Sequence, residues 1–201
     1  LTDGLDGLAA GVTLFTSLVL LVFCVNTERF LVATALAALG GASLGFLRYN
    51  LPPASIFLGD SGSYLLGYLI AGMAILGLVK SQVSSALLIP IVALGVPLFD
   101  TLLAPLRRFA HGKRPFTADR DHIHHRLLNR GYSSRKVTFI LYGATVLLCF
   151  LALILANVRD QFSGLVLVII AGASLAFFGK VGYFDSLGPR RLRNWLAEVF
   201  D

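Results

Sequence analysis

Residues 57–79 read FLGDSGSYLLGYLIAGMAILGLV, a short polar segment followed by an apolar one of membrane-spanning length. The polar part places the carboxylate of Asp60 between two glycines at the mouth of the predicted span. An ionised carboxylate at the edge of a membrane span has a high free energy unless it binds a cation or another partner. Asp60 is therefore a candidate ligand of a divalent cation; the alternative is that it only caps the helix that follows.

The composition predicts an integral membrane protein. Of the 201 residues, 56% are hydrophobic and 14% are charged, whereas soluble domains carry about 25% charged residues. Because a bilayer leaves the backbone no other partners, apolar spans are expected to be helices. We predict an all-α, polytopic fold forming one integral-membrane domain over residues 1–201. Its six spans are expected at 8–25, 30–47, 64–79, 86–106, 137–156 and 162–179.

The formal net charge of +6 has two interpretations, nucleic-acid binding and membrane topology. No groove of alternating basic and aromatic residues is visible, so we expect no nucleic acid partner. If Asp60 and the histidines share one side, that side holds fourteen of the Lys and Arg residues and the opposite side holds Arg29, Lys80 and Arg159. Basic residues mark the cytoplasmic side. We therefore predict a multi-pass protein of the plasma (inner) membrane with its polar motifs and C-terminus in the cytoplasm.

Two more polar segments are predicted to lie on the side of Asp60. Residues 3–7 read DGLDG, with carboxylates at Asp3 and Asp6. They suit metal, nucleotide or proton handling, or alternatively they stabilise the positive end of a helix. Asn50 precedes two prolines that end any helix and lead into the Asp60 segment.

The third polar segment is the cytoplasmic loop expected at 107–136, which contains His122, His124 and His125. A zinc site needs more converging ligands than this loop offers, whereas its basic surroundings suit an anion such as pyrophosphate. Asp100 precedes the loop and is expected to form a structural pair with Arg107 or Arg108. The tail at 183–201 has apolar residues at helical spacing, and we predict an amphipathic helix at the membrane surface.

In this order, the three motifs resemble those of the polyprenyl-phosphate N-acetylhexosamine-1-phosphate transferases, which form glycosyltransferase family 4. The version with Asp119-Arg120-Asp121 before His122-Ile123-His124-His125 resembles the WecA/TagO-like branch, which uses UDP-N-acetylglucosamine. The resemblance implies attack of a polyprenyl (undecaprenyl) phosphate on the sugar-linked phosphorus of a UDP-sugar, with release of UMP. The product would initiate a cell-envelope glycopolymer such as lipopolysaccharide or teichoic acid.

The resemblance also implies a role for each motif. Asp60 would bind Mg²⁺, or Mn²⁺ in its place, and Phe57 would stack on uracil. The catalytic set implied is Asp3, Asp6, Asp60, His124 and His125. The substrate-binding set implied is Gly4, Leu5, Asn50, Phe57, Arg120 and His122. The partners implied are the UDP-sugar, the lipid phosphate and the membrane, and a homodimer is compatible with the sequence.

Two features of the family pattern do not occur in the sequence. A pair of adjacent aspartates is absent, and an asparagine that precedes the first motif would fall before Leu1. We expect the chain to be the C-terminal part of a longer transferase and to be inactive alone. Two alternatives remain: a transferase for another UDP-sugar, such as the phospho-MurNAc-pentapeptide type, and a non-enzymatic transporter or scaffold.

Overall fold

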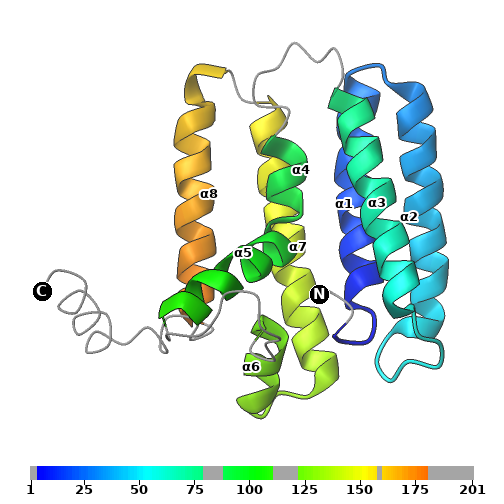
Figure 1. Cartoon of the computed structure of the whole chain (residues 1–201). Helices are drawn as coiled ribbons and strands as arrows, with labels where there is room; N and C mark the ends of the chain where they lie inside the picture. Colours follow the sequence, from blue (N-terminus) through cyan, green and yellow to red (C-terminus); the bar gives the residue numbers. More distant parts are fainter. Residues whose placement is uncertain (1–3, 79–87, 111–121, 158–159, 181–201) are drawn as a thin grey trace, which may run out of the picture.

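The computed structural model describes residues 4–78, 88–110, 122–157 and 160–180, and within them all regular structure is helical (Figure 1). This confirms the all-α class for the described part of the chain. The helices are α1 (Leu8–Asn26), α2 (Phe30–Asn50), α3 (Gly59–Leu78), α4 (Leu88–Ala93), α5 (Gly95–Ala110), α6 (Ile123–Asn129), α7 (Ser134–Asn157) and α8 (Asp160–Lys180).

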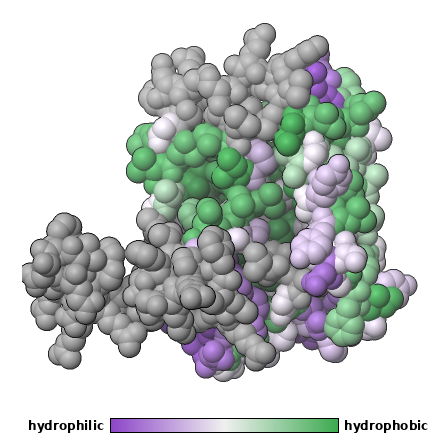
Figure 2. Space-filling view, in the orientation of Figure 1, coloured by the Kyte–Doolittle hydropathy of each residue, from purple (hydrophilic) through white to green (hydrophobic). Residues whose placement is uncertain are grey.

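Helices form where the apolar segments predicted them. Among the described residues, α1, α2 and α7 are long and apolar enough to cross a membrane. Large apolar side chains remain exposed on the bundle, including Leu31 at 84% and Val168 at 69%. In Figure 2 apolar side chains cover the middle of the visible face, and the most hydrophilic ones lie toward its top and bottom. This pattern fits a bundle surrounded by lipid.

The segment predicted as a span at 86–106 is not one continuous helix, because two helices, α4 and α5, occupy it and meet at Leu94. Pro97 has no N–H to donate to the carbonyl of Ala93, and its ring crowds that carbonyl, so a continuous helix is disfavoured here. Figure 1 shows that α5 leaves the direction of α4 and runs obliquely above α6 toward the lower end of α8. The break therefore carries Asp100, on α5, toward the histidine motif.

Helix α1 is the centre of the bundle and packs against α2, α3, α4 and α7. Its contact with α7 is close because Gly11 has no side chain: a Cβ there would overlap the ring of Tyr142. The same tyrosine ring meets Phe15 edge-on, with centroids 5.5 Å apart. This packing holds the start of α1 firmly against α7.

The polar motifs lie at one end of the bundle, the lower end in Figure 1, where α1 and α3 begin, α2 ends and α6 lies. Helix α2 ends at Asn50, as the prolines predicted, and Leu51 is already extended. Gly59 has a φ of +68°, a left-handed conformation in which glycine is favoured, and α3 begins there. Asp60 therefore occupies the first turn of α3 at the polar end.

Candidate functional site

The first motif forms a turn before α1 that α2 and α7 hold in place. The N–H of Gly7 donates to Oδ1 of Asn50 at 3.0 Å, and the hydroxyl of Tyr142 donates to the carbonyl of Gly7 at 2.6 Å. Gly7 has a φ of +78°, and a Cβ there would lie 3.0 Å from the tyrosine oxygen. Glycine is thus required both by the left-handed backbone and by the space available.

Asn50 joins this turn to the loop between α2 and α3. Its Oδ1 accepts from Gly7, and its Nδ2 donates to the carbonyl of Ile56 at 2.8 Å. The side chain is buried. Its amide group thus binds backbone atoms on both sides, an arrangement that orients the motif. Sequence reasoning predicted a substrate contact for Asn50; in the structure both ends of its amide bond to the protein backbone.

Asp6 also links the first motif to the α2–α3 loop. Its Oδ2 accepts from the N–H of Ala54 at 3.0 Å, while its backbone carbonyl accepts from Thr138 of α7 at 3.2 Å. The motif and the loop are thus tied together twice, through Asp6 and through Asn50. Neither Thr138 nor Tyr142 was predicted as part of the site, because both lie inside the apolar run of α7 and nothing local marks them.

Phe57, at the end of the α2–α3 loop, and Asp60, in the first turn of α3, are both accessible. The ring of Phe57 is 73% exposed, and Asp60 is exposed as well. Among the residues that the structure describes, no group of three or more His, Cys, Asp or Glu side chains gathers as a metal cluster. One exposed carboxylate still suits Mg²⁺, since this ion commonly uses one or two carboxylates and completes its shell with water and phosphate oxygens.

The histidine motif begins with a buried pair. Nδ1 of His122 lies 3.1 Å from Oδ2 of Asp100, and the N–H of Ile123 donates to Oδ1 of the same carboxylate at 3.1 Å. Asp100 therefore forms a structural pair with His122; its predicted pairing with Arg107 or Arg108 stays a prediction. The side chains of these two arginines lie outside the described residues.

His124 is the most enclosed histidine of the motif, with 3% of its surface exposed. Its Nε2 has no hydrogen-bond partner among the described residues. Burial lowers the pKa of His124 to about 4, and the neighbouring His125 acts in the same direction. His124 is thus neutral at pH 7, and its Nε2 can serve one proton donor or acceptor according to the tautomer.

The first and third motifs meet at Gly4 and His124. A Cβ on Gly4 would lie 2.7 Å from Cε1 of His124 and closer still to Nε2. The rings of His124 and His125 are adjacent, with centroids 4.2 Å apart. The structure therefore brings Gly4, Asp6, Asn50 and His124 together at the end where α3 begins with Asp60. Asp3 and Arg120 lie outside the described residues.

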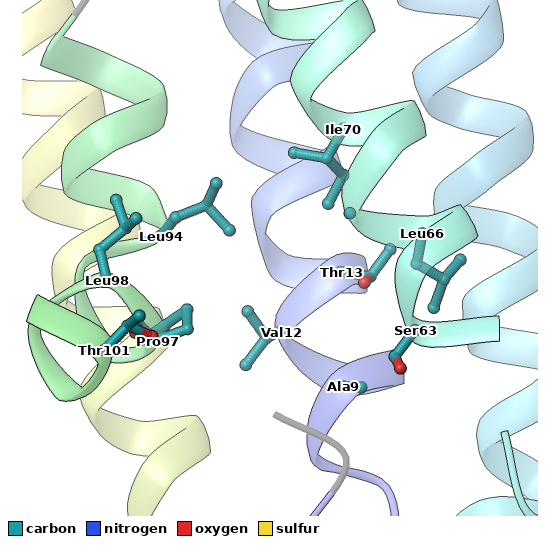
Figure 3. Close-up of a pocket in the computed structure, with 11 residues that line it drawn as sticks. Ala9, Val12, Thr13, Ser63, Leu66, Ile70, Leu94, Pro97, Leu98 and Thr101 are labelled. Atoms are coloured by element: carbon teal, nitrogen blue, oxygen red, sulfur yellow. The ribbon is translucent and has the colours of Figure 1, made fainter. Parts of the chain in front are cut away.

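A cavity of about 230 Å³ opens between α1, α3 and the α4–α5 pair (Figure 3). Ser63, one turn after Asp60, points into it, so the cavity adjoins the start of α3. Most of its wall is aliphatic, and this suits an apolar chain. The lining residues are Ala9, Val12, Thr13, Ser63, Leu66, Gly67, Ile70, Leu94, Pro97, Leu98 and Thr101.

Replacing Gly4 with alanine is expected to displace the His124 ring, because the ring is buried and the new methyl group would occupy its place. Overpacking of this kind costs about 1–3 kcal/mol of stability. We expect a lower midpoint of thermal unfolding for Gly4→Ala in detergent and recovery in the double variant with His124→Ala. Gly41→Ala is the control, since nothing lies within 4 Å of the added methyl group. A Gly4→Ala protein as stable as the control would contradict the contact.

The fold and the site together define a helical membrane protein whose polar motifs gather at one end of the bundle. The sequence profile of glycosyl transferase family 4 matches residues 1–78. The chain is 43% identical over 143 residues to a probable undecaprenyl-phosphate N-acetylglucosaminyl 1-phosphate transferase of Bacillus subtilis, covering 71% of this chain and 40% of the relative. The chain belongs to glycosyl transferase family 4.

Two further relatives extend the comparison. A decaprenyl-phosphate N-acetylglucosaminephosphotransferase of Mycobacterium tuberculosis is 38% identical over 159 residues, which are 70% of this chain and 39% of the relative. A phospho-N-acetylmuramoyl-pentapeptide-transferase of Clostridioides difficile is 38% identical over 160 residues, 77% of this chain and 46% of the relative. The chain spans less than half the length of these relatives.

Proposed function

We propose that the protein transfers N-acetylglucosamine 1-phosphate from UDP-N-acetylglucosamine to polyprenyl phosphate and releases UMP. The observation that carries this proposal is the contact between Gly4 and His124, which joins two motifs from opposite parts of the chain at the end where α3 begins with Asp60. The relatives named as N-acetylglucosamine phosphotransferases support this sugar over others.

In the proposed reaction, an oxygen of the lipid phosphate attacks the phosphorus attached to the sugar. The bond from that phosphorus to the bridging oxygen breaks, and the electron pair leaves with UMP. The product is a lipid-linked sugar pyrophosphate. An apolar cavity beside Ser63 supports the lipid substrate, because its aliphatic wall lies next to the proposed reaction centre.

We assign roles to the site residues on this basis. Gly4, Leu5 and Asp6 would bind the uridine, with the exposed ring of Phe57 stacked on uracil. The neutral His124 would bind a phosphate or sugar oxygen through Nε2, beside His125. Asp3 and Arg120 keep the roles predicted from their motifs, in catalysis and in pyrophosphate binding respectively.

Asp60 is the proposed protein ligand of Mg²⁺, or of Mn²⁺ in its place. A divalent cation bound there would offset the negative charge that builds up on the pyrophosphate oxygens. Asp60 fits this role because its carboxylate is accessible and follows Gly59 at the polar end of the bundle.

The proposed setting is the plasma (inner) membrane, crossed six times, with the polar end and the C-terminus in the cytoplasm. Arg48, at the end of α2, and Arg135 and Lys136, at the start of α7, are on the polar side, whereas Arg29 is at the other end of α2. The proposal further includes one membrane domain over 1–201, a cytoplasmic loop over 107–136 and a homodimer. The tail at 183–201 lies outside the described residues.

The test is an assay of UMP release by membranes that carry the protein expressed from its own gene. Release is expected only when UDP-N-acetylglucosamine, polyprenyl phosphate and Mg²⁺ are all present, and chelation should stop it. No UMP release above membranes without the protein would contradict the proposal. UDP-MurNAc-pentapeptide is the competitor of interest, because one group of relatives is named for its product class. If the protein used UDP-MurNAc-pentapeptide in preference to UDP-N-acetylglucosamine, it would be a transferase of the phospho-MurNAc-pentapeptide type.

A further inference from the structure

Asp100 is a buried carboxylate that the proposed reaction does not use. It lies on α5 and is 6% exposed. Both of its oxygens are engaged by the start of the histidine motif: Oδ2 by Nδ1 of His122 and Oδ1 by the N–H of Ile123, each at 3.1 Å. A buried carboxylate needs such partners, because an unpaired one would be costly.

One bond fixes where α6 begins. Helix α6 has seven residues, and the side chain of its N-cap residue, His122, makes no capping bond. The first N–H groups of a helix have no partner within it, and a side chain usually supplies one. Here the partner is the carboxylate of Asp100, which reaches the helix from α5. Ile123 and Leu127 are buried in the core beside this contact, so α6 is held by both polar and apolar contacts.

The other bond fixes the ring of His122. An ionised carboxylate can only accept hydrogen bonds, so the proton of this contact is on Nδ1. In the neutral ring, Nε2 is then the unprotonated nitrogen. The ring of His122 stacks on that of His124, with an angle of 7° between the planes and centroids 5.9 Å apart. His124 in turn lies against Gly4. Asp100 thus orients the ring of His122, which packs against the ring of His124, and His124 contacts Gly4 of the first motif.

We propose that Asp100 is a positioning residue of the transfer site, which holds α6 and the His122 ring so that Nε2 of His124 faces the Gly4 turn. The expected effect of Asp100 on turnover rests on the proposed function. Its effect on the position of α6 and His122 does not. In the proposed reaction Asp100 touches no reacting group, and it acts through His122 and Ile123.

The experiment compares Asp100→Asn with the wild type in two measurements. Hydrogen exchange at the start of α6 should become roughly ten- to a hundredfold faster, the range expected when a buried hydrogen bond to a charged group is weakened. In the UMP-release assay, kcat/KM for the UDP-sugar should fall by roughly the same factor, while KM for polyprenyl phosphate stays unchanged. Leu102→Ala is the control, since Leu102 is on the same helix and 64% exposed, and it should alter neither.

A second variant tests whether Asp100 acts through His122. In His122→Asn the amide can replace the donor at Nδ1, so exchange at the start of α6 should stay close to that of the wild type. The double variant Asp100→Asn/His122→Asn should lose no more kcat/KM than the more impaired single variant, because residues that act as one unit are not additive. Additive losses would overturn the coupling.

The outcomes separate this inference from the proposed function. Unchanged exchange of α6 in Asp100→Asn overturns the inference whatever the activity. Faster exchange with unchanged kcat/KM overturns its catalytic part. A wild-type protein that releases no UMP contradicts the proposed function instead, and the exchange measurement still decides whether Asp100 positions α6.

Discussion

Asp60→Asn is expected to abolish UMP release, lowering turnover by roughly a thousandfold or more. A bound cation supplies several kcal/mol of charge stabilisation in phosphoryl transfer, and every 1.36 kcal/mol corresponds to about a tenfold change in rate. An amide oxygen is a neutral and weaker ligand for a hard cation than a carboxylate. The measurement is UMP release over a range of Mg²⁺ concentrations, with Mn²⁺ binding followed by electron paramagnetic resonance. Both signals should be lost in the variant.

Glu28→Gln is the matched control, because it removes an exposed acid between α1 and α2, at the opposite end of the bundle. It should leave turnover unchanged. If Asp60 only stabilises the start of α3, Asp60→Asn should instead cost about 0.3–1 kcal/mol of stability and little activity. Near-normal turnover in this variant would remove Asp60 from the metal role.

Asn50→Ala is expected to destabilise the protein and to reduce turnover with it. The variant leaves the buried N–H of Gly7 and the partly buried carbonyl of Ile56 without their partner. Each lost partner costs about 1–3 kcal/mol. Because the same bonds hold the Gly4–Gly7 turn against the α2–α3 loop, the uridine-binding residues proposed there should lose their arrangement. Thermal unfolding in detergent and UMP release measure the two effects.

Two variants complete this test. Asn50→Asp keeps the acceptor for Gly7 but sets a negative charge against the carbonyl of Ile56, so it should be about as harmful as alanine. Asn26→Ala replaces an exposed asparagine at the last residue of α1, as Asn50 is the last residue of α2, and should be tolerated. If Asn50→Ala raised KM for the UDP-sugar without changing the unfolding temperature, Asn50 would be a substrate contact and not a positioning residue.

Much of the fold follows from local sequence. The apolar segments predicted at 8–25 and 30–47 are α1 and α2 with ends shifted by one to three residues, and the end of α2 at Asn50 follows from the prolines after it. The break between α4 and α5 at Leu94 was not predicted, although the sequence has a proline, Pro97, close to it. A proline near one end of an apolar run is compatible with a continuous span or with two helices, and packing decides between them.

The site was predicted only in part. Its motifs mark Gly4, Asp6, Asn50 and His124 as candidates, since polar residues and glycines interrupt apolar runs there. The contact between Gly4 and His124 agrees with the prediction that the polar segments lie on one side. Tyr142 and Thr138 gave no such signal, because a hydroxyl within an apolar helix is common and its partner is far along the chain. Asp100 was predicted to be structural, but its pairing with His122 was not predicted.

The sequence alone determined that the chain is helical, where most of its helices lie and which motifs carry its polar groups, because helix formation in a bilayer depends on local length and apolarity. The tertiary structure alone decided how those groups are held. Gly7 bonds to Asn50 over 43 positions and to Tyr142 over 135, and His122 bonds to Asp100 over 22. Such pairs depend on how the helices pack, and no local pattern encodes them.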